Sequence, residues 1–391
     1  METPDLTSAR FWESDDNHIA TDPLRPDDAD GLAEFARETL DARGWCFFQT
    51  SGSEGLPKWV GLTKEAFLVS ARAVNAFFNA TANDRWLVAL PIHHVGGFAI
   101  HARCFAAGSS MRRMNGEWSP SAFAAQCAEQ RVTLTSLVPT QVFDLASQRI
   151  AAPSCLRTVI VGGGALSAVL REQAMSLGWP ICCSYGMTEA ASQIATQSAD
   201  AAAVTAEEME VLPHWEVATD ADGVLTVRGP ALAKGYASRS KEGSWQWQAI
   251  DGAVGLRTRD RVRIRLLGAR RLLQFVGRES AFIKICGELV NRDALQTRLD
   301  HVAEQIHFPT SAVVVPLDDP RRGTTLVIAV ERSRSSPESR AILRERFNAE
   351  CLPFERATEL REIPVIPRTS LGKARITELT KMLGEPCSAP N

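Results

Sequence analysis

The sequence predicts an α/β protein with a large N-terminal domain of parallel α/β sheet, an antiparallel β subdomain and a smaller α+β C-terminal domain. Three observations predict it. The chain has 391 residues, more than a single core usually supports. Short apolar runs alternate with helical patterns between residues 86 and 183, which favours a parallel sheet. From about residue 211, period-two segments separated by Gly favour antiparallel hairpins.

The elements follow in order. A helix over 31–43, a strand over 45–49, a polar Gly-rich loop over 50–58 and an amphipathic helix over 63–78 come first. The alternating region predicts strands at 86–90, 133–138, 157–161 and 180–183 and helices at 119–130, 140–149 and 167–177. Antiparallel strands are expected at 224–227, 261–267 and 272–276, then strands at 312–316 and 325–330 and a helix at 336–350. We place the boundary near Gly277, which predicts a large domain over 1–276 and a small one over 277–391.

Composition excludes several classes of protein. Hydrophobic residues make up 45% and charged residues 23%, as in ordinary globular proteins, and the net charge of −3 predicts no general attraction to nucleic acid or anionic membrane. No run of about 18 apolar residues predicts a membrane span. The Asp-rich start lacks the apolar segment of a signal peptide, and the nine Cys form no C-x-x-C pair. We therefore expect reduced thiols and a cytoplasmic protein.

Seven Arg between residues 257 and 271 could indicate a nucleic-acid surface. Arg261, Arg263 and Arg265 alternate with apolar residues, as on a half-buried strand with a solvated face. Because no set of aromatic residues is interleaved with them, we favour the strand.

The loop Thr50-Ser51-Gly52-Ser53-Glu54-Gly55-Leu56-Pro57-Lys58 suits phosphate. Small hydroxyl residues and Gly let backbone amides approach phosphate oxygens, and Lys58 adds a positive charge. Its Lys follows Pro, unlike the pattern G-x-x-x-x-G-K-[ST]. A flexible surface turn is the alternative.

A second motif, Ser184-Tyr185-Gly186-Met187-Thr188-Glu189, directly follows a predicted parallel strand, where α/β sheets bind ligands. Tyr185 could stack on a base, Thr188 could contact phosphate and Glu189 could hold Mg²⁺. A plain turn with Tyr185 in the core is the alternative.

A third motif, Pro367 to Lys373, places a Lys after Gly near the chain end, where a mobile loop could deliver it. A solvated surface Lys is the alternative.

These motifs, in this order, resemble those of the acyl-adenylate-forming enzymes: acyl-CoA ligases, peptide-synthetase adenylation domains and luciferases. Residues 50–58 match [ST]-S-G-[ST]-T-G-x-P-K except at Glu54, 185–189 match Y-G-x-T-E, and 367–373 match P-x-T-x-x-G-K. Four further stretches of the chain also resemble segments of this family: Val161 to Leu166, Gly223 to Pro230 with Gly235-Tyr236, Arg257 to Asp260, and Gly277-Arg278 to Val290. The resemblance covers roughly residues 45–375.

The resemblance implies ATP, Mg²⁺ and coenzyme A as small-molecule partners. It implies that Glu189 holds Mg²⁺, that Thr188 contacts phosphate, and that Lys373 on the small domain bridges the substrate carboxylate and the α-phosphate. The implied nucleotide- and coenzyme-binding residues are Thr50, Ser51, Gly52, Ser53, Gly55, Lys58, Gly163, Gly164, Ala165, Tyr185, Gly186, Asp260, Arg278 and Gly287.

Ser184 to Thr196, Leu90 to Gly97 and Leu137 to Gln141 are similar to the o-succinylbenzoate–CoA ligases of menaquinone biosynthesis. The implied substrate is the carboxylate o-succinylbenzoate, with His94 lining the acyl pocket or the coenzyme A tunnel. Ser192, Gln193 and Thr196 offer neutral donors for a second carboxylate or a keto group. The alternatives are a polar helix start for these three residues and a hydrogen-bonded core position for His94.

The sequence also departs from the family pattern. Only 49 residues precede the loop, which predicts an abbreviated N-terminal part, and Glu54, His93, Arg259 and Ser280 replace family residues. Another aryl- or acyl-CoA ligase, a carrier-loading adenylation enzyme and a non-catalytic nucleotide-binding relative remain alternatives, and a homodimer stays open.

Overall fold

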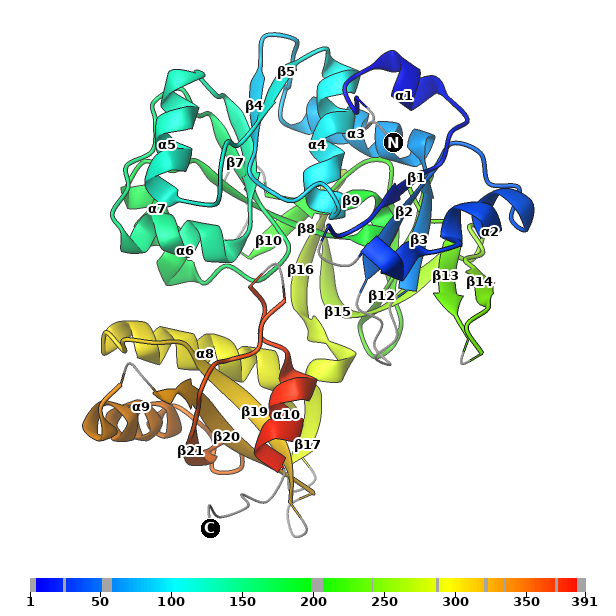
Figure 1. The fold of residues 1–391 in the computed structure, drawn as a ribbon. Helices are drawn as coiled ribbons and strands as arrows, with labels where there is room; N and C mark the ends of the chain where they lie inside the picture. The colour runs from blue at the N-terminus through cyan, green and yellow to red at the C-terminus, as the bar shows by residue number, and fades with distance from the viewer. Residues whose placement is uncertain are drawn as a thin grey trace. The chain divides into compact units, whose positions relative to one another are not determined.

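The computed structural model describes residues 5–23, 26–50, 58–197, 207–240, 242–285, 288–319, 323–332, 335–369 and 372–384. Contacts within the chain divide it into two compact units. Unit 1 comprises Met1–Thr258 and Val262–Phe275, and unit 2 comprises Arg259–Arg261 and Val276–Asn391. Figure 1 shows mixed α/β structure in both, which confirms the predicted fold class.

The predicted parallel sheet forms one half of an 11-stranded sheet ordered β11-β12-β15-β16-β10-β9-β8-β7-β6-β4-β5. Neighbours from β8 to β5 pair in parallel, and helices connect them. The strands are β4 (Arg85–Val88), β5 (Ser110–Arg113), β6 (Leu134–Leu137), β7 (Thr158–Val161) and β8 (Ile181–Met187), and the helices are α4 (Val95–Ala107), α5 (Pro120–Glu129), α6 (Pro139–Ser147) and α7 (Ala168–Ser176).

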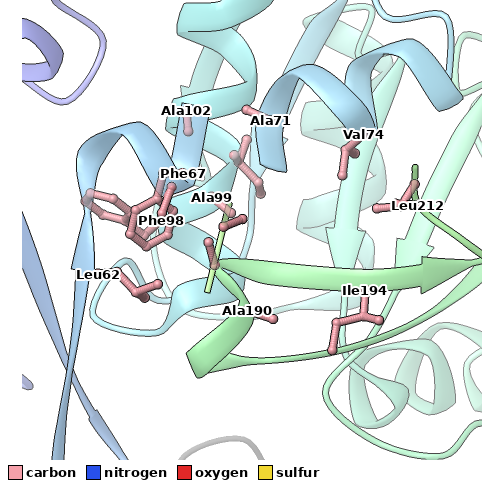
Figure 2. Packing of buried hydrophobic residues seen from close by; sticks show 14 of the residues in the cluster. Leu62, Phe67, Ala71, Val74, Phe98, Ala99, Ala102, Ala190, Ile194 and Leu212 are labelled. Carbon is pink, nitrogen blue, oxygen red and sulfur yellow. The ribbon is translucent and has the colours of Figure 1, made fainter. Parts of the chain in front are cut away.

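Helix α4 was not predicted. Its sequence, VGGFAIHARCFAA, is apolar almost all round, so it lacks the 3.6-residue period that marks a surface helix. The structure explains this composition, because most of the helix is buried. Figure 2 shows Phe98, Ala99 and Ala102 of α4 packed against Phe67 and Ala71 of helix α3 (Lys64–Phe77).

Alternate residues of the parallel strands enter two cores. Trp86 and Val88 join the core that contains α3 and α4, whereas Leu87 joins a second core with residues of α5, α6 and α7. Burial on both faces accounts for the continuous apolar runs in the sequence.

The remaining strands of the large sheet confirm the predicted antiparallel region. They are β9 (Ser192–Thr196), β10 (Glu208–Val211), β11 (Glu216–Thr219), β12 (Val224–Arg228), β15 (Leu256–Leu267) and β16 (Arg270–Arg278). Along β15 the side chains of the Arg-rich segment are mostly exposed at alternate positions, with Arg257 paired to Asp220 and Arg265 to Glu208. The Arg-rich segment is therefore the solvated face of a strand.

A five-stranded sheet ordered β1-β2-β3-β13-β14 completes unit 1. Its strands are β1 (His18–Ala20), β2 (Trp45–Thr50), β3 (Lys58–Thr63), β13 (Gly235–Arg239) and β14 (Trp245–Ala249), accompanied by helices α1 (Ala9–Glu13) and α2 (Leu32–Glu38). The helix predicted over 31–43 ends at Glu38, because Asp41 adopts a left-handed conformation with φ 45°.

Unit 2 packs helices on both faces of the sheet β19-β20-β21. Val314 enters the core with α8 and α9, while its neighbours Val313 and Val315 enter the core with α10. The elements are β17 (Phe282–Ile285), β18 (Glu288–Asn291), α8 (Arg292–Gln305), β19 (Ala312–Asp319), β20 (Gly323–Glu331), α9 (Pro337–Ala349), β21 (Ala357–Ile363) and α10 (Ile376–Gly384). Among the described residues of the whole chain, no helix is long and apolar enough to cross a membrane.

Candidate nucleotide and carboxylate site

The carboxyl ends of the parallel strands bring several predicted site residues to one edge of unit 1. His94 follows β4, Gly163, Gly164 and Ala165 follow β7, and Tyr185 to Glu189 end or follow β8. Strands β7 and β8 are neighbours, and Ser184 Oγ donates a hydrogen bond to the carbonyl of Val161 across 3.2 Å. The exposed Gly-rich turn therefore lies beside the strand end that carries Tyr185.

A sharp backbone turn follows Tyr185. The pairing of β8 with β9 is irregular between Tyr185 and Gly186, and a Cβ added at Gly186 would lie 1.6 Å from the carbonyl oxygen of Ser192. Ala191 and Ser192 have φ angles of 47° and 106°, which are rarely adopted by residues other than Gly. This bend confines Thr188–Ala190 to a single 3₁₀ turn, named η2, on which Glu189 lies.

Tyr185 has a stacking partner within unit 1. Its ring is buried, and its centroid lies 5.8 Å from that of Phe275 at an interplanar angle of 30°. Phe275 was not anticipated from the sequence, because nothing in the local pattern brings a residue of β16 close to one of β8, with β9 and β10 between them in the sheet. Tyr185 thus combines a core position with a place at the edge where the predicted site residues gather.

Tyr236 lies between Glu189 and Lys58, the last residue of the predicted phosphate-binding loop 50–58 (the phosphate loop). The Tyr236 hydroxyl donates a hydrogen bond to Glu189 Oε1 across 3.1 Å, and Lys58 Nζ lies 5.9 Å from the centroid of the Tyr236 ring. Residues from three separate sequence motifs therefore converge, although they are far apart in the chain.

The strands on either side of the phosphate loop hold its two ends together. Thr50 and Lys58 are paired at the ends of β2 and β3, and Thr50 Oγ1 donates to the carbonyl of Lys58 across 3.3 Å. The predicted phosphate-binding residues between them, Ser51, Gly52, Ser53 and Gly55, lie outside the described residues, as does Gly287.

The alternative of a helix start for Ser192, Gln193 and Thr196 is wrong, because all three lie on strand β9. The Thr196 hydroxyl donates to the carbonyl of Cys183, so Thr196 has an internal structural role. Gln193 is 3% exposed, and neither polar atom of its side chain has a hydrogen-bond partner among the described residues. A buried amide without partners is costly, which makes Gln193 the stronger candidate for contact with a ligand.

Arg103 of α4 is a candidate that the sequence analysis missed. It is 2% exposed, and its guanidinium donates to Ser192 Oγ across 3.3 Å and lies 5.8 Å from the Trp86 ring centroid. Burial lowers its pKa to about 10, so it stays charged at neutral pH. No carboxylate among the described residues pairs with it. Because an unpaired buried charge is strongly unfavourable, an anionic ligand would compensate it.

His94 precedes α4 and contacts His93, with 4.5 Å between ring centroids. Burial, reinforced by the neighbouring His93, lowers the pKa of His94 to about 4. Its imidazole is therefore neutral at neutral pH and does not add a second cation to the edge.

Two predicted residues of the nucleotide site pair within unit 2. Arg278 Nε donates to Asp260 Oδ1 across 3.1 Å, and Asp260 is buried. Lys373 is exposed on a turn closed by hydrogen bonds between its backbone and Thr369. Glu189 and Lys373 belong to different units.

A surface cavity of about 740 Å³ lies near β5 and the end of α4, lined by residues that include Arg85, Trp86 and Arg112. None of the predicted site residues lines it. The candidate site at the strand ends is therefore indicated by the chemistry of its side chains and not by this cavity.

Known proteins resemble this chain in sequence and in fold. Residues 11–237 match the family model described as AMP-binding enzyme. The chain is 28% identical over 260 residues to a 2-succinylbenzoate–CoA ligase of Bacillus subtilis, covering 62% of this chain and 52% of that protein. It is 27% identical over 378 residues to a protein of the same name from Bacillus velezensis, covering 92% and 74%.

Among solved structures, o-succinylbenzoate CoA synthetase from Bacillus subtilis in complex with the acyl-adenylate intermediate matches with a TM-score of 0.73 and 25% identity. The match covers 85% of this chain and 68% of that one. The chain spans about half the length of the Bacillus subtilis 2-succinylbenzoate–CoA ligase that it matches in sequence.

Proposed function

Because the chain belongs to the family of AMP-binding enzymes, we propose that it is an ATP-dependent carboxylate–CoA ligase that converts o-succinylbenzoate to its CoA thioester through an acyl-adenylate. The observation that carries the proposal is that Lys58 and Tyr236, from the five-stranded sheet, converge on Glu189, which follows the parallel strand β8. This convergence brings together the Lys58 cation, which suits the phosphates of Mg·ATP, and the Glu189 carboxylate, which suits its metal ion.

The residues present fit Mg²⁺. This ion binds through one or two carboxylates together with phosphate and water oxygens, rather than in a dedicated protein cage. Glu189 offers one such carboxylate, and its Oε1 accepts a hydrogen bond from the Tyr236 hydroxyl. Bound there, Mg²⁺ would neutralise phosphate charge.

The proposed reaction has two steps. In the first, a substrate carboxylate oxygen attacks the α-phosphorus of ATP and pyrophosphate leaves. Lys58 and the loop 50–58 hold the triphosphate, Thr188 contacts phosphate, and Lys373 bridges the carboxylate and the α-phosphate. In the second, the sulfur of coenzyme A attacks the acyl carbon and AMP leaves. Electrostatic stabilisation by positioned donors carries the first step.

The other predicted site residues bind the nucleoside part of ATP and coenzyme A in the proposed reaction. Tyr185 with the turn Gly163–Ala165 binds the adenine, Asp260 and Arg278 bind the ribose, and unit 2 acts as a lid that delivers Lys373. Gly186 keeps the backbone close to the nucleotide, and Gly287 leaves room for the pantetheine arm.

Arg103 supports a substrate with a second carboxylate. Its buried charge lies beside Ser192, three residues after Glu189, so an anion bound there would compensate it. The aromatic dicarboxylate o-succinylbenzoate meets this requirement, and a fatty acid does not.

We also propose that the protein works in the cytoplasm, since the seven cysteines that the structure describes are all free thiols.

The test is pyrophosphate release against a panel of carboxylates, with and without coenzyme A. We expect o-succinylbenzoate to exceed benzoate and octanoate in kcat/KM and thioester to form only with coenzyme A. Equal turnover of octanoate would contradict the substrate, and adenylate formation without use of free coenzyme A would indicate a carrier-loading enzyme.

A further inference from the structure

Tyr236 has no task in the reaction proposed above, yet it contacts Glu189 directly. Its hydroxyl donates to Glu189 Oε1 across 3.1 Å. We propose that Tyr236 is a positioning residue, which holds the Glu189 carboxylate in the orientation that binds Mg²⁺. This inference rests on the proposed function and adds a residue to its metal site.

The local backbone alone gives Glu189 little support. It lies on η2, a turn of three residues, and the two residues that follow Ala190 have positive φ angles. A short 3₁₀ turn holds only the backbone, and the side-chain torsions of a Glu on it stay free to rotate. The hydrogen bond from Tyr236, which comes from outside the turn, therefore contributes to the orientation of the carboxylate.

The segment before Tyr236 is attached to both sides of the site. The backbone N–H of Ala233 donates to the carbonyl of Glu189, and that of Lys234 donates to the carbonyl of Gly61 on β3, both across 2.8 Å. In the pairing of β13 with β3, Tyr236 is opposite Val60 and Ser238 is opposite Lys58. The same strand thus fixes Tyr236 relative to Glu189 and to the end of the phosphate loop.

The chemistry of a phenol suits this task. Its neutral O–H can hold one carboxylate oxygen without cancelling the negative charge, which remains for the metal. A Lys in this place would compete with Mg²⁺. Hydrogen bonds from outer residues to ligating carboxylates commonly tune metal affinity by 10–100-fold.

The test variant is Tyr236→Phe, which keeps the ring beside Lys58 and removes only the hydroxyl. ATP binding is measured by calorimetry across a Mg²⁺ series, without carboxylate substrate or turnover. We expect the half-saturating Mg²⁺ concentration to rise about tenfold, the typical effect of losing an outer hydrogen bond to a metal ligand. Affinity for ATP without Mg²⁺ and the thermal midpoint should stay unchanged. An unchanged Mg²⁺ dependence would overturn the positioning role.

A double-mutant cycle with Glu189→Gln separates this role from a structural one. If Tyr236 acts through Glu189, adding Tyr236→Phe to Glu189→Gln causes no further shift. Additive shifts would overturn the inference. If Glu189→Gln alone left the Mg²⁺ dependence unchanged, the metal site of the proposed function would fail, and the positioning role with it. A shift in Glu189→Gln with none in Tyr236→Phe would remove the positioning role only.

Discussion

Arg103 donates a hydrogen bond to Ser192 Oγ across 3.3 Å, which joins the buried helix α4 to the strand that follows Glu189. The contact brings the buried positive charge of Arg103 next to Ser192, one of the residues that the sequence predicts to bind the substrate. It also connects α4, which begins within residues 90–97, to residues 184–196; the segments 90–97 and 184–196 resemble the same group of ligases.

Arg103→Gln should weaken binding of the dicarboxylate selectively. Removing a charge-assisted contact should raise KM for o-succinylbenzoate about 10–100-fold, while the affinity for ATP stays the same. Steady-state kinetics with each substrate varied in turn measure both values. Arg85→Gln, an exposed Arg at the start of β4, is the control. Equal loss of ATP and carboxylate affinity would indicate a structural role for Arg103.

Lys373→Ala should separate the two half-reactions. The adenylation step needs a cation beside the attacking carboxylate, whereas the thioester step starts from an adenylate already made. We expect pyrophosphate release to fall by about 10²–10³-fold while supplied acyl-adenylate and coenzyme A still give thioester. The exposed Lys381 of α10 provides the matched control, Lys381→Ala. Equal impairment of both half-reactions would contradict the delivery of Lys373 by a lid.

Gly186→Ala should destabilise unit 1 and impair nucleotide binding together. The added Cβ would lie 1.6 Å from a backbone oxygen, so the turn between β8 and β9 must move. We expect a loss of roughly 3 kcal/mol in the free energy of unfolding, as for overpacking of a rigid site. Urea denaturation measures it. Gly252→Ala, whose Cβ would meet nothing within 4 Å, should change stability little.

Asp84 should contribute to acid stability. Burial raises its pKa, but hydrogen bonds from Arg157, Thr81 and Thr133 outweigh this effect and lower the pKa to about 2. The unfolded chain binds a proton near pH 4 and the folded chain only near pH 2. Stability from Asp84, about 2 kcal/mol, is therefore present above pH 4 and is lost as the pH falls toward 2.

Asp84→Asn should lower the free energy of unfolding at pH 7 by roughly 2–3 kcal/mol and flatten its decline between pH 4 and pH 2. Urea titrations across that range measure both effects. Glu65→Gln, which breaks an exposed pair with Arg72, should change stability by less than about 1 kcal/mol. An unchanged acid slope in Asp84→Asn would show that other carboxylates dominate.

Local patterns were sufficient to predict much of the fold. The strands at 133–138 and 157–161 and their intervening helix appeared close to their observed bounds, because a buried parallel strand needs an unbroken apolar run. The sequence also indicated Tyr185, Glu189 and Lys58 as candidate site residues, because phosphate and metal chemistry restricts residue type and spacing.

Long-range packing decided what the sequence could not indicate. Helix α4 has no amphipathic period because it is buried on most sides, and Arg103 looks like any helical Arg until its surroundings are known. The contact between Tyr236 and Glu189 spans 47 positions in the chain. By itself the sequence determined the α/β class and the residue types of the motifs, since these depend on local period and composition. Which charges are buried and which motifs meet depended on tertiary structure, because burial and hydrogen bonding between distant strands exist only once the sheets have assembled.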